Sequence, residues 1–425
     1  MREMKDSNSD WIGSIPENWE LLTVGSLFKV RNEKVNDTDY PPLSVSKGGI
    51  VPQMENVAKT NATDNRKMVL KDDFVINSRS DRKQSCGVSP LDGSVSLINT
   101  VLYLAPNVPI IPAYLNYLLK NYGFAEEFYR WGHGIVADLW TTRWQEMKNI
   151  TLPVPPMDEQ MAIVSNISAQ MPKVDSLIAN VQAQIEKLKA YKQSLITEVV
   201  TKGLDPNAPM KDSGVEWLGA VADTRRIFRL KYLLNFPMQY GANESGDKYT
   251  DGSVRYIRIT DITADGKLKD DENNQYISDT IASEYTLKDG DVLFARSGGT
   301  VGKSFLFRKE YGQCAFAGYL IKVECNQKVL LPEYLIYYTQ SSLYNLWKNM
   351  IFIQATIQNI GANKYSNMEI PIPTIAEQES IVEHLKTKCS QIEQLISLKE
   401  SKIEKLQQYK RSLIYEYVTG KKEVV

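Results

Sequence analysis

The stretch ARSGGTVGKS, at residues 295–304, has the residue types of a phosphate-binding loop. A P-loop follows the pattern G-x-x-x-x-G-K-[ST], and here Ser297 stands in place of the first glycine. A P-loop also needs a strand before it and a helix after it, because the helix N-terminus holds the phosphates. DVLFA before the motif fits a strand, but SFLFRKEYG after it favours a second strand. We therefore interpret the stretch as a glycine turn between two strands, and keep a P-loop-like NTPase as an alternative.

Patterns for other catalytic chemistry are missing from the sequence. It has no G-x-S-x-G motif and no paired-carboxylate pattern. YPPL at residues 40–43 lacks the Asn or Asp of a methyltransferase signature. The four cysteines form no C-x-x-C pair, and there are only two histidines, His133 and His384. We expect no catalytic residue, no metal ligand and no disulfide framework in this chain.

The composition is that of an ordinary globular protein. Hydrophobic residues make up 43% and charged residues 24% of the 425 residues, a length that suggests two or three domains. The N-terminus has no apolar leader, and no apolar run is long enough to span a membrane, so we expect a cytoplasmic protein. The net charge of −1 predicts no polyanion partner, although a basic face can be offset by acidic residues elsewhere.

An internal duplication is the strongest feature of the sequence. Residues 152–202 align without a gap to residues 370–420, with 20 identities in 51 positions. MKDSNSDWIG at residues 4–13 also returns as MKDSGVEWLG at residues 210–219. Each half therefore consists of a divergent globular part, a P-x-P segment and a long helix. The similarity of the helices indicates a shared purpose, whereas the globular parts do two different jobs of one kind.

Both predicted helices carry an apolar stripe of the heptad type. A helix of this length spans about 60 Å and acts as a spacer, and we expect the two helices to pack on each other. Pro172 should kink or break the first of them. The residues predicted for the helix–helix interface or for a partner subunit are Val174, Leu177, Val181, Ile185, Leu188, Tyr191, Leu195, Ile392, Leu395, Ile403, Leu406, Tyr409 and Leu413.

The globular parts are rich in short strands, among them residues 73–77, 101–105, 291–295, 303–307 and 319–323. PAYLNYLLKNY in the first half and PEYLIYYTQSS in the second are predicted helices. The expected fold class is therefore α+β, with two globular domains, two long helices and a pseudo-two-fold internal repeat.

Basic loops follow equivalent strands in the two halves. Arg79-Ser80 aligns with Arg296-Ser297, and more basic side chains follow in each loop. Arginine beside hydroxyl residues suits both phosphates and guanine edges. Asn and Gln, which can pair with adenine, occur in IFIQATIQNIGANKY. The candidate DNA-binding residues are Ser46, Lys47, Arg79, Ser80, Arg82, Lys83, His133, Arg143, Arg258, Arg296, Ser297, Thr300, Lys303, Gln354, Thr356, Gln358 and Asn359.

These motifs resemble one known family. WIGSIPENWE, the doubled P-x-P-x-x-x-EQ, the doubled IEKL-x-x-YK-x-SLI-x-E-x-VT and the linker TKGLDPNAPMKDSGVEWLG are similar to the specificity subunit of type I restriction-modification systems. The resemblance covers nearly the whole chain. The second half departs from it, because AVADTRRIF lacks the Ile-Pro and the second Trp of the first half, so Arg225 and Arg226 either contact DNA or contact nothing.

The resemblance implies a non-catalytic subunit with two target-recognition domains, each reading one half of a split, asymmetric site in double-stranded DNA. It also implies that the helices form an antiparallel coiled coil that fixes the half-site distance and docks two methyltransferase subunits, through which restriction subunits join. S-adenosylmethionine, ATP and Mg would be bound by those partners, and no cofactor by this chain. The domains implied are 1–152 and 205–370 for target recognition, the latter including a linker at 205–213, and 153–204 and 371–425 for the helices.

Two further alternatives remain open at this point. The chain could be the recognition subunit of a fused methyltransferase-nuclease, a type II-like system, which the sequence does not separate from the first interpretation. It could also be a coiled-coil scaffold with no nucleic-acid role.

Overall fold

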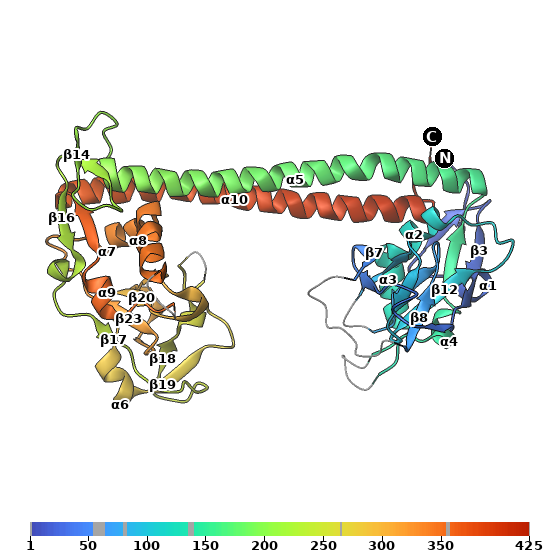
Figure 1. Cartoon of the computed structure of the whole chain (residues 1–425), viewed down its shortest axis with the longest axis horizontal. Coiled ribbons are helices and arrows are strands. Elements are labelled where there is room, and N and C mark those ends of the chain that lie inside the picture. Colours follow the sequence, from blue (N-terminus) through green and yellow to red (C-terminus); the bar gives the residue numbers. More distant parts are fainter. Residues whose placement is uncertain are drawn as a thin grey trace. The chain divides into compact units, whose positions relative to one another are not determined.

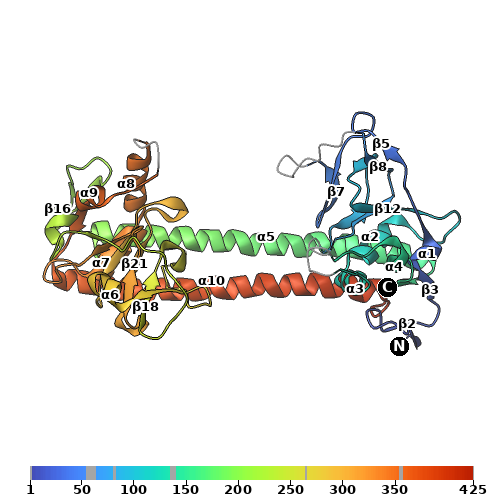
Figure 2. The ribbon, with the colours of Figure 1, turned by 90° about the horizontal axis from the view of Figure 1, so that it is seen from below.

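A computed structural model describes residues 2–53, 64–79, 83–134, 140–263, 266–353 and 358–424. The chain divides into two compact units (Figures 1 and 2). Unit 1 consists of Met1–Gln182 and Glu400–Val425, and unit 2 of Ala183–Lys399. Each unit contains one globular α+β domain and one stretch of each of two long helices, α5 (Met157–Lys202) and α10 (Ile375–Val418). The α+β class and the two-domain organisation expected from the sequence are confirmed.

The domain of unit 1 contains a four-stranded antiparallel sheet in the order β10-β9-β12-β4 and a three-stranded sheet in the order β11-β8-β5. The pairs β1-β2, β3-β13 and β6-β7 complete it. The strands are β1 (Met4–Asp6), β2 (Ser14–Pro16), β3 (Glu20–Thr23), β4 (Phe28–Val30), β5 (Lys34–Val35), β6 (Leu43–Ser46), β7 (Gly49–Pro52), β8 (Arg66–Val69), β9 (Phe74–Asn77), β10 (Cys86–Val88), β11 (Gly93–Val95), β12 (Asn99–Leu104) and β13 (Thr151–Val154). The helices are α1 (Val24–Leu27), α2 (Pro112–Lys120), α3 (Tyr122–Arg130) and α4 (Trp144–Met147).

The domain of unit 2 repeats this plan with a four-stranded sheet in the order β17-β23-β20-β21 and a three-stranded sheet in the order β19-β18-β22. The pairs β14-β15 and β16-β24 correspond to β1-β2 and β3-β13. The strands are β14 (Met210–Asp212), β15 (Ala220–Ala222), β16 (Arg226–Arg229), β17 (Gln239–Tyr240), β18 (Ser253–Ile257), β19 (Gln275–Ser278), β20 (Val292–Ala295), β21 (Ser304–Leu306), β22 (Cys314–Phe316), β23 (Leu320–Val323) and β24 (Glu369–Ile372). The helices are α6 (Asp279–Ala282), α7 (Pro332–Gln340), α8 (Ser342–Ile353) and α9 (Ala362–Ser366), with short 3-10 turns η3 (Leu230–Leu233), η4 (Ile259–Asp261), η5 (Ser283–Tyr285), η6 (Gly298–Thr300) and η7 (Lys309–Tyr311).

The glycine-rich stretch at residues 295–304 is a hairpin turn. Strands β20 and β21 pair antiparallel, with Phe294 opposite Ser304. Gly298 and Gly302 have φ values of 75° and 81° in the turn between them, a left-handed conformation that side chains other than glycine rarely adopt. Because the segment after Lys303 is a strand, no helix N-terminus faces this turn, and the prediction of a glycine turn is confirmed.

Each unit has one main hydrophobic core, which includes residues of the two long helices. In unit 1, Phe74 of β9 and Leu118 of α2 share a core with Ile167 of α5 and Leu413 of α10. In unit 2, Phe294 of β20 belongs to the corresponding core, together with residues of α7, α8 and both long helices. The long helices are therefore structural parts of each domain, and burial of their apolar stripes drives this packing.

Within each unit the stretches of α5 and α10 lie side by side and run antiparallel (Figures 1 and 2). In unit 1, Lys410 Nζ lies 2.5 Å from Asp175 Oδ1, and Gln170 Nε2 donates to Tyr417 Oη at 2.9 Å. In unit 2, Lys192 Nζ lies 2.5 Å from Glu393 Oε1. The two ion pairs occupy equivalent positions of the duplication, so the helix pairing repeats with the sequence.

α5 runs unbroken through Pro172, so the break considered at this residue is absent. A proline inside a helix removes one backbone hydrogen bond. Met171 and Val174, on either side of Pro172, are buried, and packing of this kind stabilises a helix against the loss.

The predicted apolar stripe divides into three groups by burial. The buried residues are Val174, Val181, Ile185, Ile392 and Leu413. The half-buried residues are Leu188, Leu195, Ile403 and Leu406. Leu177, Tyr191, Leu395 and Tyr409 are 51%, 57%, 48% and 50% exposed and lie outside the seam between the helices.

A buried glutamine joins each domain to the start of a long helix. In unit 1, Gln160 Nε2 donates to the carbonyl oxygens of Pro109 and Pro155, at 2.7 and 2.9 Å, and its Oε1 accepts from the Ile111 N–H at 2.9 Å. Gln378 makes the same three contacts in unit 2. Both side chains are 0% exposed, so the E-Q pair of the repeated motif has a structural role.

A buried tyrosine joins each domain to the end of the other long helix. Tyr114 Oη donates to the carbonyl oxygens of Pro153 and Val418, at 3.1 and 3.0 Å. In unit 2, Tyr334 Oη makes the same bifurcated contact with the carbonyl oxygens of Pro371 and Val200. Burial raises the pKa of the Tyr114 hydroxyl well above its ordinary value, so it remains a hydrogen-bond donor.

The two units differ at the residue that faces the first turn of each long helix. In unit 1 the Trp19 indole N–H donates to Glu159 at 3.0 Å, and Arg2 also pairs with this carboxylate. Arg225 occupies the position of Trp19 in unit 2, where it is 0% exposed and lies 2.6 Å from Glu377 Oε1. Because Arg225 is buried, its side chain is not available to DNA. Its contact is with Glu377 of the same chain.

We expect loss of the buried glutamine to loosen one unit only. Gln160→Leu leaves two carbonyl groups and one N–H without partners, which should lower the free energy of unfolding of unit 1 by about 2–3 kcal/mol. Hydrogen exchange measured by mass spectrometry should show faster exchange in unit 1 peptides alone, and Gln378→Leu should give the reverse pattern. Gln391→Leu, at an exposed position, serves as the control. Equal loosening of both units by either variant would contradict this prediction.

We expect Arg225→Ala to destabilise unit 2 by about 3 kcal/mol, because it removes one partner of a largely buried ion pair and leaves a cavity. Arg226→Ala, the exposed neighbour, should change the stability by less than about 0.5 kcal/mol. Hydrogen exchange of unit 2 peptides at increasing denaturant concentration measures the free energy of unfolding of both variants. A neutral Arg225→Ala variant would show that the Glu377 pair contributes nothing.

Candidate nucleic-acid interface

The basic loops of the two units sit on the same backbone scaffold, with a one-residue difference from the predicted alignment. An isolated antiparallel bridge joins Arg79 to Thr141 in unit 1 and Ser297 to Asn359 in unit 2. The structural counterpart of Arg79 is therefore Ser297, and the predicted pairing of Arg79 with Arg296 is wrong. Successive residues of an extended chain point to opposite faces, so the two units present their arginine on different sides of this segment.

Unit 1 has a basic cleft beside this bridge, with a volume of about 760 Å³. We call it the unit 1 cleft. Arg79 and Arg143, both exposed and both predicted, line it, and Lys29 of β4 and Lys67 of β8 add two more positive charges. Its remaining lining residues are Gly25, Phe28, Val30, Asn32, Ser78, Leu97, Ile98, Thr100, Thr141 and Trp144. No lining residue is acidic, so the cleft attracts anions.

Polar groups in the cleft are held in place by the sheet. Lys67 Nζ donates to the Asn99 carbonyl oxygen at 2.7 Å, and burial lowers the pKa of its ammonium group. The hydroxyls of Ser78 and Thr100 are 2.8 Å apart. In contrast, the exposed Leu97 and Ile98 give one wall an apolar surface. Such a mixture of fixed polar groups and apolar surface suits contacts to both phosphates and base edges.

The other predicted residues of unit 1 lie outside the lining of this cleft. Ser46 and the exposed Lys47 belong to the β6–β7 hairpin. Lys83 pairs with Glu126 at 3.0 Å and lies 4.1 Å from the centre of the Tyr129 ring. His133 is exposed and pairs through its backbone with Thr141. Ser80 and Arg82 lie outside the described residues.

In unit 2 the corresponding surface consists of aromatic side chains around an arginine. The guanidinium of Arg296 lies 4.9 Å from the ring centre of Tyr240, and the backbone N–H of Arg296 donates to the Tyr319 carbonyl oxygen at 3.0 Å. Tyr240 and Tyr319 are 42% and 61% exposed. Ser297 and the exposed Asn359 form the neighbouring bridge. We call Tyr240, Arg296, Ser297, Tyr319 and Asn359 the unit 2 patch. The exposed Gln358 directly precedes Asn359 in the sequence.

The structure does not place Lys303 in the unit 2 patch. Lys303 lines a different cleft of about 530 Å³, together with Lys348 and with Lys386 of α10. Burial lowers the pKa of Lys348. Arg258, another predicted contact, is paired with Asp261 at 2.8 Å. Thr300 belongs to the turn η6, while Gln354 and Thr356 lie outside the described residues.

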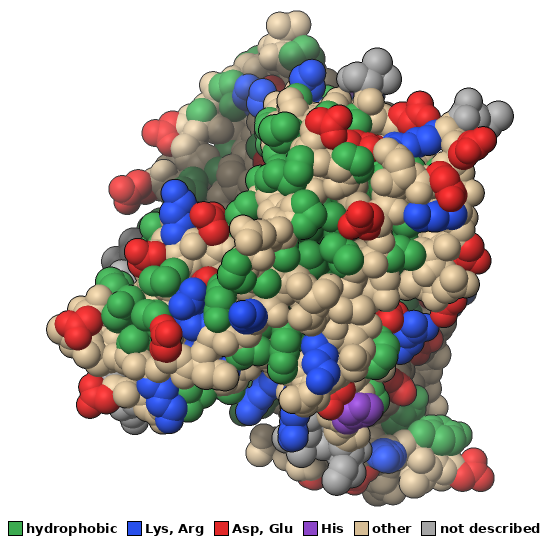
Figure 3. All heavy atoms as spheres, turned by 90° about the vertical axis from the view of Figure 1, so that its right-hand side faces the viewer, with side chains coloured by type: hydrophobic (Ala, Val, Ile, Leu, Met, Phe, Trp, Pro, Cys, Tyr) green, Lys and Arg blue, Asp and Glu red, His purple; other side chains and the backbone are tan. Residues whose placement is uncertain are grey.

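The surface of unit 1 is not uniformly basic. Figure 3 shows one face on which hydrophobic side chains reach the surface in a band, with charged side chains of both signs around it. This mixed surface agrees with the net charge of −1 for the whole chain. Any binding of a polyanion must therefore depend on local basic clusters such as the unit 1 cleft.

Sequence reasoning missed Lys29, Lys67, Tyr240 and Tyr319 as site residues. The two lysines come from strands that neighbour the predicted loops only through sheet pairing. Tyr240 and Tyr319 are exposed aromatic residues beside strands, and this composition is a signal that inspection of the basic loops alone does not use.

Among the described residues, no three His, Cys, Asp or Glu side chains gather to hold a metal ion. All four cysteines are buried and free, and burial raises the pKa of the Cys86 thiol to about 12. None of the helices in the described part of the chain combines the length and the apolar character that crossing a bilayer requires.

Comparison with known proteins finds a matching domain, similar sequences and a solved chain of the same fold. Residues 226–408 match the type I restriction modification DNA specificity domain. The MjaVIII specificity subunit of Methanocaldococcus jannaschii is 24% identical over 64% of this chain and 62% of its own length. The chain thus spans less than two thirds of that relative. The putative MjaX specificity subunit of the same organism is 23% identical over 96% of this chain and 95% of its own length.

A solved chain from a study of complex assembly and conformational transition in the type I R-M system has the same fold. It is 16% identical, and the superposition has a TM-score of 0.71 and covers 95% of this chain and 98% of that chain. Residues 226–408 thus match a type I restriction modification DNA specificity domain, and the chain as a whole is similar in sequence to type I specificity subunits and in fold to the solved chain.

Proposed function

We propose that this chain recognises a split DNA site, with unit 1 reading one half and unit 2 the other, and directs methyltransferase and restriction subunits to it. The observation that carries the proposal is that one backbone scaffold presents two different sets of polar side chains. The Arg79–Thr141 bridge of unit 1 corresponds to the Ser297–Asn359 bridge of unit 2. Two domains with the same backbone scaffold but different polar side chains suit an asymmetric, two-part DNA sequence.

Unit 1 binds its half-site through the unit 1 cleft. Four cationic side chains, Lys29, Lys67, Arg79 and Arg143, line the cleft without an acidic residue. Contacts from lysine and arginine to phosphates position a protein on DNA, and arginine also pairs bidentately with guanine. The half-buried Lys67 is fixed to Asn99 and supplies local positive charge, while the exposed Arg79 and Arg143 are free to reach DNA.

Unit 2 binds its half-site through the unit 2 patch. Tyr240 and Tyr319 present aromatic surface to the apolar edges of bases, and Asn359 and Gln358 have the amide groups that pair with adenine. Arg296 lies against the Tyr240 ring, and its Nη1 is 3.5 Å from the Gly318 carbonyl oxygen. Its half-buried guanidinium adds a positive charge beside the two exposed aromatic rings, which favours an approaching phosphate.

The exposed apolar residues of the long helices dock the methyltransferase subunits. Leu177 and Leu395 are equivalent in the duplication, as are Tyr191 and Tyr409, and all four are about half exposed. Apolar residues that stay exposed in both copies are typical of a protein interface. The partners supply the chemistry and bind S-adenosylmethionine, ATP and Mg, and the complex acts in the cytoplasm, where its DNA substrate is found.

The proposal is tested by co-expressing the chain with its cognate methyltransferase subunit and sequencing the methylated genome. We expect adenine methylation at one split motif. Asn359→Ala should relax the base preference in one half of the motif only, and Arg143→Ala in the other half only, because each residue belongs to one unit. Lys71→Ala, exposed and outside the unit 1 cleft, is the control. Methylation at a continuous site, or relaxation of the same half by both variants, would contradict the proposal.

Arginine contacts in unit 1 should also be visible in the salt dependence of binding. Because we expect Arg79 to contact a DNA phosphate, Arg79→Ala should weaken DNA binding by the assembled complex. It should also reduce the slope of the logarithm of the association constant against the logarithm of the salt concentration by about 1. Fluorescence anisotropy at several salt concentrations measures the slope. Arg225→Ala, whose side chain is buried, should leave the slope unchanged. An unchanged slope for Arg79→Ala would remove this residue from the phosphate contacts.

A further inference from the structure

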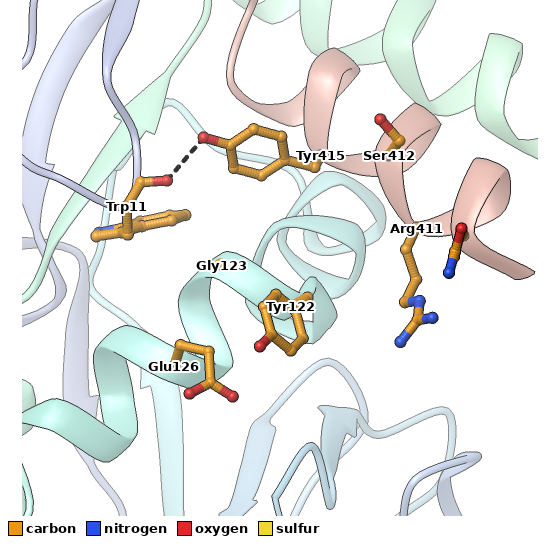
Figure 4. Close-up of a pocket in the computed structure, with 8 residues that line it drawn as sticks. Trp11, Tyr122, Gly123, Glu126, Arg411, Ser412 and Tyr415 are labelled. Carbon is orange, nitrogen blue, oxygen red and sulfur yellow. Dashed lines mark hydrogen bonds between the residues drawn. The ribbon is translucent and has the colours of Figure 1, made fainter.

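Unit 1 has a hollow between α3 and the last turns of α10 that is separate from the unit 1 cleft (Figure 4). We call it the α3–α10 hollow, and its volume is about 510 Å³. Trp11, Tyr122 and Tyr415 provide aromatic walls, and Arg411 and Ser412 of α10 line the side opposite Trp11 (Figure 4). A concave aromatic site of this size accommodates a bulky side chain of a partner protein.

Two of the walls are held rigidly. The Tyr415 hydroxyl donates to the Trp11 carbonyl oxygen at 2.9 Å (Figure 4), and Lys421 Nζ lies 4.8 Å from the centre of the Tyr415 ring. Trp11 is only 8% exposed and packs edge-on against Phe124, with ring centres 6.1 Å apart. The hollow is therefore preformed, and binding in it does not require these two rings to be ordered.

The charge of the hollow is positive. Glu126, its acidic residue, already pairs with Lys83 at 3.0 Å. Arg411 is exposed and makes no ion pair or hydrogen bond with any residue that the structure describes. An occupant that places an acidic group beside its apolar side chain would therefore match the site.

The corresponding place in unit 2 is filled. α8 is the counterpart of α3, and Leu343, which is only 7% exposed, stands at the position of Gly123. Thr197 of α5 replaces Tyr415. Its Oγ1 accepts from the Ser342 N–H at 2.8 Å, so the start of α8 is in direct contact with α5. The duplication has thus preserved the helices and the tryptophan, since Trp217 corresponds to Trp11, but the two tyrosine walls occur in unit 1 alone.

The hollow adjoins the exposed helix surface that we assign to the methyltransferase subunit. Tyr409, 50% exposed, directly follows Gln408, which lines the hollow, and lies three residues before Ser412 on the same face of α10. The equivalent Tyr191 of unit 2 is 57% exposed, and Thr197 stands in that unit in place of the Tyr415 wall. A partner that covers Tyr409 would also reach the α3–α10 hollow.

We propose that the α3–α10 hollow receives a bulky apolar side chain of the methyltransferase subunit, next to an acidic group of the same subunit that pairs with Arg411. This inference rests on the proposed function, because it assigns part of the docking surface proposed there. Its consequence is that the methyltransferase subunits docked at the two units are held differently. The subunit at unit 1 has an anchor that the subunit at unit 2 lacks.

The test fills the hollow by Ser412→Trp and uses Ser194→Trp as the matched control, since Ser194 is the exposed equivalent in unit 2. Native mass spectrometry and light scattering measure how many methyltransferase subunits bind per chain. We expect two for the unchanged chain and for Ser194→Trp. Ser412→Trp should weaken one of the two sites about tenfold or more, as loss of a central anchor does. Arg411→Glu should weaken the same site, and this loss should be smaller at high salt.

Each other outcome contradicts the inference in a recognisable way. Unchanged binding by both Ser412→Trp and Arg411→Glu would show that the hollow is not used. Equal weakening by Ser412→Trp and Ser194→Trp would assign docking to the helix surface alone. A dimer of the isolated chain that Ser412→Trp dissociates would identify a second copy as the occupant. Failure of the unchanged chain to bind any methyltransferase subunit would overturn the proposed docking itself. Thermal unfolding of each variant, unchanged from the parent chain, confirms that the substitution leaves the fold intact.

Discussion

The structure depends on the way each globular domain is joined to the long helices. Gln160 and Gln378 each satisfy three backbone groups inside a core, and Tyr114 and Tyr334 each bridge a strand and a helix end. Buried polar groups of this kind are costly to leave unpaired, so the domain and the helix stretches of one unit are held in one arrangement. The loops that follow β9 and β20 are thus fixed to the helix surface of the same unit. If a partner binds the helices as we propose, it is thereby coupled to the surface that we propose contacts DNA.

This fixed framework leaves the surface residues free to diverge. The strand pairs β9-β10 and β20-β21 keep the same register, yet the second residue after β9 is the exposed Arg79, whereas the second residue after β20 is Ser297. The unit 1 cleft and the unit 2 patch differ through side chains of this kind, while the hydrogen bonds between the backbone strands are the same in both units. Specificity can therefore change without loss of stability, because the altered side chains are not those that satisfy buried groups.

The repeat and the apolar periodicity were sufficient to predict the α+β class, the doubled helix and the β20–β21 hairpin. They did not give the alignment of the two basic loops correctly, because the correspondence of Arg79 with Ser297 depends on a bridge to residues far along the chain. Lys29 and Lys67 line the cleft because sheet pairing brings their strands beside it, and strands that pair in a sheet can be far apart in the sequence. Heptad spacing also put Tyr191 and Tyr409 on the apolar stripe, but helix rotation within the pair leaves them exposed. Local sequence patterns thus predict helices and strands, whereas pairing between distant segments determines which side chains come into contact.

The glutamate at the start of each long helix has a consequence for the domain that packs against it. Glu159 accepts from an indole and a guanidinium, and Glu377 accepts from the buried Arg225. A carboxylate at this position is thus compatible with two unlike donors, because its oxygens accept from any N–H group that reaches them. The residue that the domain places opposite the helix can therefore differ between the two units, while the glutamate of the helix stays the same.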